Sequence, residues 1–559
     1  MAMELENIVA NTVYIKAREG DRGRTKKWKE ALRLPLVSEC MQLKDEIEHT
    51  YEYLVEGQPI GEQLFKQFCS KDPQMARCIE YLSAVKEFNM VADEKCNTAA
   101  RSVFDEYIST RSPTRVQTFS EDLATELESR LVPPIARNLF QRSRDVVRDF
   151  LSGQPFISYM ESPYYLRYLQ WKSLERMPVT KNSFRQYRVL GKGGFGLVYA
   201  CQAKVSGKMY ALKKLDKKRV KKRKGEKLAL NEKQILEQVH SRFVVNLAYS
   251  YQSKDSLCMV LTLMNGGDLR FHIHNIGRPG LGEERAVFHA AELACGLYHL
   301  HTSRIAYRDM KPENILLDDY GHIRISDLGL AIQIPPDQSV RGRVGTIGYM
   351  APEVIDHHRY TFAPDWWGLG CVVFEMIEGE CPFRKKDRAS REEVERRVRE
   401  DPVTFSEKFS EPSKLFCSQL LDKTPATRLG TNFEEVRSHA FFRSVNWTHL
   451  ESGIVEPPFK LNPKAVYAKD VLDIDQFSSV RGVEMEGEDE EFAGKFATGA
   501  VSKPWQEEMI DSKVFEDINK LTPIESMSAA DPSTQTPPTD QQTKWYHRLF
   551  RRRTVAVTT

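Results

Sequence analysis

A short polar string near the middle of the chain constrains its fold and chemistry more than any other feature. The string spans residues 307–314 and reads Tyr-Arg-Asp-Met-Lys-Pro-Glu-Asn; Asp-Leu-Gly follows at 327–329 and Ala-Pro-Glu at 351–353. Phosphoryl transfer needs a carboxylate that accepts the proton of the incoming hydroxyl, and oxygen ligands that hold Mg²⁺ against the phosphates. The spacing predicts Asp309 as the base and Asn314 and Asp327 as metal ligands, with Lys311 in the same catalytic set.

A glycine-rich loop stands upstream and predicts a nucleotide site. Residues 191–198 read Gly-Lys-Gly-Gly-Phe-Gly-Leu-Val, a pattern that alone can also open a dinucleotide-binding βαβ unit. The residues that follow are strand-like and turn at Ser206-Gly207, whereas a dinucleotide loop runs into a helix. A hairpin over the phosphates of ATP is the better interpretation. The predicted ATP-binding residues of this loop are Leu190, Gly191, Lys192, Gly193, Gly194, Phe195, Gly196, Leu197 and Val198.

The next parts of a protein kinase follow in order. Lys213 ends a strand-like Tyr-Ala-Leu-Lys run and is predicted to contact the α- and β-phosphates. Glu232, in the helical run 229–236, is predicted to pair with Lys213. Pseudokinases lose residues of the Lys213, Asp309 or Asp327 type, and none is lost here, which favours an active enzyme.

Further positions are assigned by resemblance to protein kinases. That resemblance implies that Met264 offers backbone groups to adenine and that Asp268 or Glu313 approaches the ribose. It also places Asp365 and Arg428 in the scaffold of the large lobe, where Arg428 pairs with Glu353.

Composition indicates a multidomain protein. The 559 residues correspond to about three or four domains, and 41% hydrophobic residues suffice for ordinary cores. The ten cysteines form no C-x-x-C pair, so neither a disulfide framework nor a zinc site is indicated. No apolar run approaches 18 residues, and Glu4 and Glu6 stand where a signal peptide is basic. The sequence predicts a cytoplasmic protein and indicates no nucleic-acid partner.

The N-terminal segment has two features that suggest contacts outside the domains. Leu5, Ile8, Val9 and Val13 recur at helical spacing over residues 3–19, either as a helix packed on its own domain or as a docking element. A basic cluster that includes Lys26, Lys27 and Lys29 follows, with Trp28 among the charges. It is either a binding site for anionic lipid headgroups or a solvated linker.

Residues 38–172 have a helical pattern rich in Leu, Phe and Tyr, which predicts an all-α domain without catalytic residues. The kinase motifs are expected to span Phe184 to Phe442, and the boundary of the kinase domain is placed at about residue 448.

Two segments after the kinase domain are polar. Residues 484–491 are strongly acidic and are predicted to form a mobile surface loop, and residues 523–543 are predicted to be disordered. The basic residues at 217–224 fit either a solvated face of the small lobe or a nuclear-import patch.

The C-terminal segment combines aromatic and basic residues. Its predicted membrane-binding residues are Lys544, Trp545, Arg548, Leu549, Phe550, Arg551, Arg552 and Arg553. Five basic residues at ~1 kcal/mol each, together with buried aromatic and aliphatic side chains, suffice for reversible anchoring to anionic phospholipids. Calmodulin sites and nuclear-import patches use the same residue types, so these alternatives stay open. No cysteine follows Cys417, so lipidation of the C-terminus is not expected.

Over nearly its whole length the chain resembles the G-protein-coupled receptor kinases. The resemblance is carried by two strings, Glu-Leu-Glu-Asn-Ile-Val-Ala-Asn-Thr at 4–12 and Gln-Pro-Ile-Gly-Glu-Gln-Leu-Phe at 58–65. It is also carried by Tyr307, which replaces the usual His before Arg-Asp, and by Leu328, which replaces Phe in the Asp-Phe-Gly motif. The subfamily with a C-terminal basic amphipathic helix is the most similar. The implied fold is multidomain α+β: a bilobal kinase domain at 184–448 inserted into an RGS-homology helical bundle at 38–183. Residues 1–37 and 521–559 form the N- and C-terminal segments, and residues 449–520 cross the nucleotide cleft and return to the bundle.

The resemblance also implies a function. The chain is expected to be a serine/threonine kinase that uses ATP and Mg²⁺ to phosphorylate agonist-activated receptors and so promotes their desensitisation at the inner face of the plasma membrane. Its N-terminal helix would dock on the receptor, and Ser478 and Ser479 match autophosphorylation sites. Gly342 occupies the position of the activating phosphothreonine of related kinases, so Arg308 has no phosphate partner there. A scaffold that binds receptor, Gα or calmodulin without catalysis, and a kinase for soluble substrates, are the alternatives.

Overall fold

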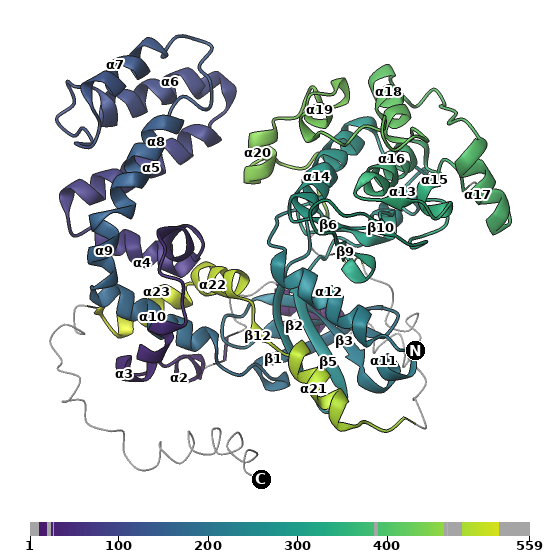
Figure 1. Ribbon diagram of the computed structural model, residues 1–559, viewed down its shortest axis with the longest axis horizontal. Coiled ribbons are helices and arrows are strands. Elements are labelled where there is room, and N and C mark those ends of the chain that lie inside the picture. Colours follow the sequence, from purple (N-terminus) through teal and green to yellow (C-terminus); the bar gives the residue numbers. More distant parts are fainter. Residues whose placement is uncertain are drawn as a thin grey trace.

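The computed structural model describes residues 11–18, 24–25, 27–384, 389–462, 465, 467 and 483–524. A helical bundle and a two-lobed domain lie side by side, and the chain passes from the first to the second near residue 180 (Figure 1). Helices from the far end of the chain return to the bundle. The predicted class, an α+β kinase fold inserted into an all-α bundle, is therefore confirmed.

The bundle is formed mainly by residues 37–175. Its helices are α3 (Val37–Cys40), α4 (Pro59–Cys69), α5 (Pro73–Met90), α6 (Asp93–Val103), α7 (Glu121–Ser129), α8 (Gln141–Ser152), α9 (Gln154–Met160) and α10 (Pro163–Glu175). The Pro-Ile-Gly string begins α4 because Pro59 suits the first helical turn. A Cβ atom at Gly61 would lie 1.9 Å from the carbonyl oxygen of Leu54, so glycine is needed where α4 meets the preceding segment.

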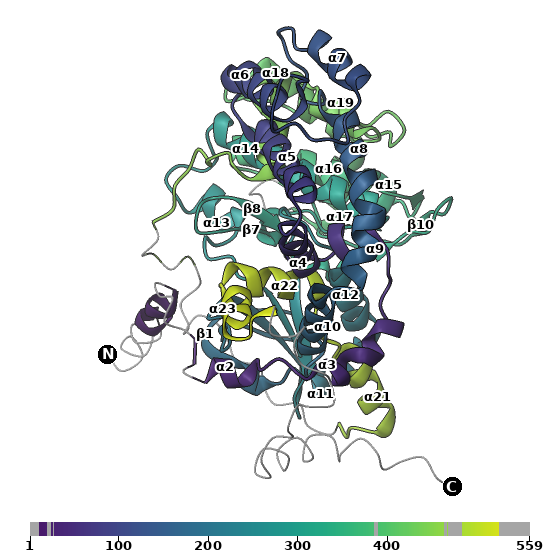
Figure 2. The same ribbon diagram turned by 90° about the vertical axis from the view of Figure 1, so that its left-hand side faces the viewer.

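Two C-terminal helices complete the bundle. Helices α22 (Ser502–Asp511) and α23 (Val514–Leu521) lie against α4 and α10 (Figure 2). The fully buried guanidinium of Arg167 on α10 donates to Asn519 at 2.7 Å and to the carbonyl of Thr522 at 2.8 Å. The rings of Trp171 and Phe515 are 5.3 Å apart. Residues 502–524 therefore pack on the bundle.

The small lobe is an antiparallel sheet with two helices. Its strands are β1 (Phe184–Lys192), β2 (Gly196–Ala203), β3 (Met209–Asp216), β4 (Leu247–Gln252), β5 (Ser256–Thr262) and β12 (Gly499–Ala500), in the order β1-β2-β3-β5-β4-β12. Helices α11 (Lys217–Lys222) and α12 (Glu226–Gln238) connect β3 to β4. The edge strand β12 comes from the segment after the kinase domain and pairs with Tyr249 and Ser250 of β4.

The large lobe is helical and carries the catalytic loop. Its helices are α13 (Leu269–His274), α14 (Glu283–Thr302), α15 (Pro352–Ile355), α16 (Ala363–Glu378), α17 (Arg391–Glu400), α18 (Glu411–Leu420), α19 (Phe433–Arg437) and α20 (Trp447–Ser452). Short strand pairs frame the loop: β6 (Ile305–Ala306) with β9 (Ile332–Gln333), β7 (Ile315–Leu317) with β8 (Ile323–Ile325), and β10 (Val340–Arg341) with β11 (Arg359–Tyr360).

The acidic segment was wrongly predicted as a mobile loop. Residues 487–496 instead form helix α21 (Gly487–Phe496). Two of its own residues, Ala493 and Phe496, are buried against the small lobe. Lys221 of α11 binds Asp489 at 2.8 Å, and the Asp489 carboxylate also accepts the backbone N–H of Glu486 at 2.7 Å. The acidic helix and the basic segment 217–224 are thus partners on one face of the small lobe. Lys217 and Arg219 are themselves buried, so that segment is not simply a solvated surface.

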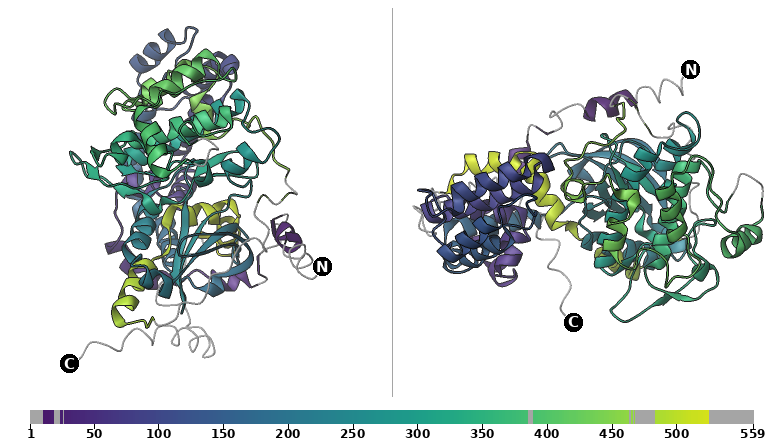
Figure 3. Two further views of the ribbon diagram at one scale, coloured as in Figure 1. Left: turned by 90° about the vertical axis from the view of Figure 1, so that its right-hand side faces the viewer. Right: turned by 90° about the horizontal axis from the view of Figure 1, so that it is seen from above.

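The two bodies also meet at the large lobe. His449 Nε2 of α20 lies 3.0 Å from the carbonyl oxygen of Val91, just after α5 of the bundle. Seen from above, the bundle lies to one side of the kinase domain (Figure 3). Within the described part of the chain, no helix is both long enough and apolar enough to span a membrane.

Candidate active site

The catalytic loop is fixed by a buried carboxylate from α16. Asp365 accepts the backbone N–H groups of Tyr307 at 2.9 Å and Arg308 at 2.7 Å, and His301 Nε2 lies 2.8 Å from the same carboxylate. Arg308 has a φ of 68°, a left-handed conformation that is unfavourable for a side chain with a Cβ. The two hydrogen bonds to Asp365 hold this turn. They present Asp309 at the end of the loop.

Asp309 is surrounded by groups that orient its carboxylate. Lys311 Nζ lies 2.7 Å from Oδ2, Asn314 Nδ2 donates to Oδ2 at 2.8 Å, and the Thr346 hydroxyl donates to Oδ1 at 2.7 Å. Lys311 also donates to Thr346 Oγ at 2.8 Å. The side chain of Asp309 is only 8% exposed. This arrangement suits a base that must meet a substrate hydroxyl in one orientation.

Lys213 links the two lobes of the site. Its Nζ is 2.6 Å from Glu232 of α12 and 3.3 Å from Asp327. Burial opposes the ammonium charge, but the attraction of Glu232 and Asp327 outweighs it and raises the pKa of Lys213 above its usual value. Lys213 in turn lowers the pKa of Asp327. Lys213 is therefore placed to hold phosphate oxygens and Asp327 to hold a metal cation at neutral pH, while Glu232 orients Lys213.

The residues predicted to hold Mg²⁺ fit that cation. Asn314 donates its amide hydrogens to Asp309, which leaves its carbonyl oxygen as the ligand atom. Asp327 adopts a left-handed conformation, with a φ of 51°, and its side chain is 55% exposed. Mg²⁺ prefers oxygen ligands and takes the remainder from water and substrate phosphates, so two side chains suffice.

The glycine-rich loop turns tightly between β1 and β2. Gly193 N–H donates to the carbonyl of Gly196 at 2.8 Å. A Cβ atom at Gly196 would lie 1.7 Å from the Lys214 carbonyl oxygen, so this glycine permits the close approach of β3. Arg223, at the end of α11, donates to the Gly194 carbonyl at 2.9 Å, and Phe195 packs on Gly225. Helix α11 and the turn after it therefore support the loop tip.

The hinge residues are close to the site but have additional partners. Met264 lies two residues after β5, as expected for a hinge. Asp268 accepts the backbone N–H of Phe271 at 2.8 Å and begins α13. Glu313 binds Arg270 of α13 through Oε1 at 2.8 Å, while its Oε2 is buried with no hydrogen-bond partner among the described residues.

The predicted docking helix lies across the junction of the lobes. Within the described residues 11–18, which are helical, Asn11 contacts Arg188 of β1, Tyr14 contacts Asn265 of the hinge and Arg18 pairs with Asp319 of the large lobe. The side chain of Val13 is 49% exposed. Leu5, Ile8 and Val9 lie outside the described residues. So do Lys26, Ser478, Ser479 and the segment 544–553.

The basic cluster near the N-terminus is partly tied down. Trp28 of α2 (Trp28–Ala31) is buried in the core of the bundle, whereas Lys27 and Lys29 are exposed. Arg24 pairs with Asp517 of α23 at 3.2 Å. Trp28 thus anchors the segment, and the two exposed lysines remain accessible to an anionic surface.

The activation segment is held without a phosphate. Arg308 donates to the Leu330 carbonyl at 2.8 Å and to the Tyr360 hydroxyl at 3.3 Å, and that hydroxyl donates to the Gly342 carbonyl at 2.9 Å. Sequence reasoning missed Tyr360, Thr346 and the role of α11, because the motif strings do not include them. A hydroxyl residue directly after Gly345 was the only sequence signal for Thr346.

This fold and site define a protein kinase. A protein kinase domain model matches residues 184–442, and a regulator of G protein signaling domain model matches residues 50–168. G protein-coupled receptor kinase 4 of Rattus norvegicus is 53% identical over 98% of this chain and 97% of its own length. G protein-coupled receptor kinase 1 of Caenorhabditis elegans is 50% identical, over 92% of this chain and 87% of its own. Rhodopsin kinase GRK7 of Ictidomys tridecemlineatus is 44% identical, over 92% and 95%.

The chain belongs to the G protein-coupled receptor kinase family. It is a serine/threonine protein kinase, as the sequence predicted.

Proposed function

We propose that this kinase phosphorylates serine and threonine residues of agonist-activated G-protein-coupled receptors and so promotes their desensitisation. The names of its relatives supply the receptor class. The observation that carries the proposal is the helix at residues 11–18, which contacts β1, the hinge and the large lobe together through Asn11, Tyr14 and Arg18. A receptor that binds the exposed side of this helix would favour the conformation in which the lobes are closed.

The chemistry follows from the residues of the site. Mg·ATP would be held by the glycine-rich loop, by Lys213 and by the oxygens of Asn314 and Asp327. Bound Mg²⁺ would neutralise the charge that develops on the transferred phosphoryl group. Asp309 accepts the proton of the substrate hydroxyl, and Lys311 and Thr346 keep its carboxylate in place. Positioning of this kind and proton acceptance account for catalysis without any covalent intermediate on the protein.

We further propose that the enzyme acts as a peripheral protein at the cytoplasmic face of the plasma membrane. Lys26, Lys27, Lys29 and the basic segment 544–553 are the residues that would contact anionic phospholipids, and calmodulin would compete for the same segments. Ser478 and Ser479 are the proposed autophosphorylation sites. The exposure of Lys27 and Lys29 beside the buried Trp28 supports the first of these contacts.

The decisive experiment is transfer of labelled phosphate from Mg·ATP to a purified receptor in lipid vesicles, with and without agonist. A soluble peptide serves as the second substrate. Arg18→Ala should reduce receptor phosphorylation much more than peptide phosphorylation, because its contact with Asp319 belongs to the bridge between lobes. Lys520→Ala, at a side chain of α23 that is 74% exposed, is the control. Labelling that is independent of agonist would instead indicate a kinase for soluble substrates.

A further inference from the structure

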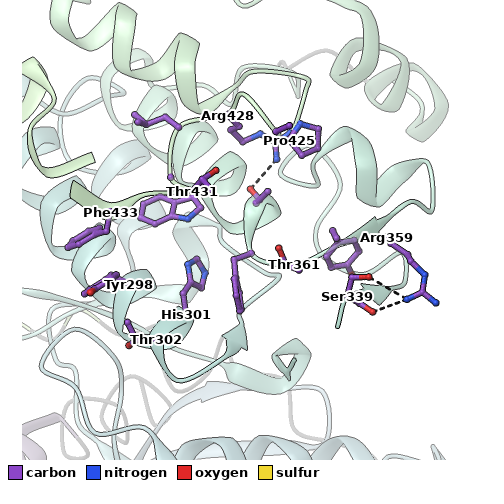
Figure 4. Close-up of a pocket in the computed structure, with 17 residues that line it drawn as sticks. Tyr298, His301, Thr302, Ser339, Arg359, Thr361, Pro425, Arg428, Thr431 and Phe433 are labelled. Carbon is purple, nitrogen blue, oxygen red and sulfur yellow. Dashed lines mark hydrogen bonds between the residues drawn. The ribbon is translucent and has the colours of Figure 1, made fainter. Parts of the chain in front are cut away.

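A second cavity lies in the large lobe, away from the nucleotide site. It has a volume of about 730 Å³ and is bounded by the end of α14, the start of α16, β11 and the segment before α19 (Figure 4). This volume falls in the range of small-molecule sites, roughly 300–1,000 Å³. None of the residues assigned to the active site above as a base, a metal ligand or a nucleotide contact lines it.

The walls of the cavity are aromatic. Tyr298 and Phe433 stack with their centroids 4.1 Å apart and their planes 6° from parallel, although Tyr298 is 44% exposed. His301 stacks on Phe362 at 4.7 Å, and Trp366 meets His301 edge-on at 5.7 Å. Flat walls of this kind favour a planar ring, because offset stacking and edge contacts add to the burial of apolar area.

The charge of the lining has one sign. Among the described residues that line the cavity none carries a carboxylate, whereas Arg359 lies on the side opposite Tyr298 and Phe433 (Figure 4). Arg359 uses one terminal nitrogen to donate to Ser339, at 3.1 Å to the carbonyl and 3.4 Å to the hydroxyl. A guanidinium has five N–H donors, so its other edge can bind a carboxylate.

The wall residues also hold the catalytic loop. His301 contacts Asp365, which fixes the backbone of Tyr307 and Arg308. Arg428, another wall residue, forms the buried pair with Glu353 at 2.6 Å, and Tyr360 binds Arg308. A ligand that packs on these side chains is therefore coupled to Asp309 through at most two intervening residues.

We infer that this cavity is an allosteric site for a planar aromatic carboxylate, with its rings beside Tyr298 and Phe433 and its carboxylate at Arg359. Such a ligand binds the arrangement in which His301 and Arg428 keep the loop assembled, and so raises kcat. None of the described residues that line it belongs to the helix at 11–18 or to the basic cluster near the N-terminus.

The test uses 2-naphthoate as the probe and 2-naphthalenemethanol as its neutral counterpart, titrated against the full chain by calorimetry. With about 0.3 kcal/mol for each of 13 non-hydrogen atoms, a Kd of about 1 mM is expected for the carboxylate. The neutral probe should bind about threefold more weakly, as for an exposed ion pair. Arg359→Gln should abolish this difference.

Two further variants locate the site. Tyr298→Ala removes a wall and Ala426→Trp fills the cavity from its exposed rim, and each should weaken binding by about fivefold or more. Tyr320→Ala, at a tyrosine that is 74% exposed elsewhere on the large lobe, is the control and should bind like wild type. Thermal unfolding of each variant establishes that it is folded. Peptide kcat should rise at saturating 2-naphthoate, and this rise should be lost in Ala426→Trp.

Each outcome decides a part of the inference. Unsaturable binding, or equal binding by wild type and Ala426→Trp, would overturn the site. Equal affinity for the two probes in wild type would overturn the preference for an anion. Binding that leaves kcat unchanged would overturn the coupling to the catalytic loop.

Discussion

The carboxylate of Glu508 on α22 accepts a hydrogen bond from the hydroxyl of Tyr249 on β4 at 2.6 Å. The same carboxylate accepts the hydroxyl of Tyr210 on β3 at 2.5 Å and contacts Ser206 in the turn between β2 and β3. Glu508 is fully buried. One side chain of the bundle thus accepts hydrogen bonds from three hydroxyls of the small lobe, and it fixes that lobe to the bundle.

Glu508→Ala should destabilise this junction strongly. It leaves the buried hydroxyls of Tyr210 and Tyr249 without an acceptor, at about 1–3 kcal/mol for each group. We expect the midpoint of thermal unfolding to fall by about 5 °C or more. Glu507→Ala is the control, because Glu507 is 44% exposed and pairs with His240 at the surface. Equal shifts for the two variants would argue against the role of Glu508.

The same carboxylate should make stability depend on pH. Burial raises the pKa of Glu508 above its ordinary value of 4.5. A group that binds its proton more tightly in the folded state contributes most below the ordinary pKa, and the contribution is lost as pH rises through the native value. Wild type should therefore lose stability relative to Glu508→Gln as pH rises above 4.5. A constant difference between the two unfolding midpoints over this range would contradict the prediction.

Asp309→Asn should remove catalysis and leave nucleotide binding intact. An amide cannot accept the hydroxyl proton, and a positioned base contributes about 10²–10⁴-fold to the rate. Peptide kcat should fall by that factor, whereas the affinity for Mg·ATP, measured by fluorescence of a nucleotide analogue, should be unchanged. Glu407→Gln, at an exposed residue of the large lobe, controls for a general effect of charge. Retention of most of kcat would exclude Asp309 as the base.

Tyr360→Phe should impair catalysis by disconnecting the activation segment. It removes the hydroxyl that joins Arg308 to the Gly342 carbonyl, a contribution of about 0.5–1.5 kcal/mol for a neutral hydrogen bond. We expect peptide kcat to fall by about two- to tenfold with the KM for ATP unchanged. Tyr320→Phe, at an exposed tyrosine, is the control and should leave peptide kcat unchanged. A rise in the KM for ATP without a fall in kcat would show that Tyr360 supports nucleotide binding and not the activation segment.

The pairing of α11 with α21 should be visible in nucleotide binding. Lys221→Glu breaks the contacts of α11 with Asp489 and Glu486 of the acidic segment. Because Arg223, at the end of α11, donates to the Gly194 carbonyl of the glycine-rich loop, a displaced α11 should disturb that loop. An ion pair near the surface contributes modestly, so the KM for ATP should rise by at most about fivefold. The double variant Lys221→Glu with Asp489→Lys restores the opposite charges and should recover the KM. No recovery would show that the charge pair is not what supports the loop.

The sequence predicted the parts of the structure that depend on short motifs. Asp309, Asn314 and Asp327 were assigned from their spacing, and the structure places the first two in contact and Asp327 beside Lys213. Such assignments are possible because each role requires one residue type at a nearly fixed separation along the chain. The helical character of residues 38–172 was likewise predictable from periodicity, since each amphipathic helix carries its own signal.

The sequence failed where a contact joins distant segments. The acidic run at 484–491 looked solvated because its partner, Lys221, lies more than 260 residues earlier. Glu508 gave no signal for the same reason, since its tyrosine partners are 259 and 298 positions away. Trp28 seemed part of a surface cluster, yet it is buried in the core of the bundle. Local composition cannot predict what a side chain meets through folding of the remainder of the chain.

The location of α22 and α23 has a consequence for the order in which the protein forms during translation. These helices cover α4 and α10, but the ribosome makes them only after about 330 further residues, roughly 15–65 s later at typical elongation rates. In that interval the kinase domain emerges while the first helices still expose an uncovered apolar face. The bundle is begun first and finished last, so the nascent chain is a candidate client for chaperones until residue 524 has been made.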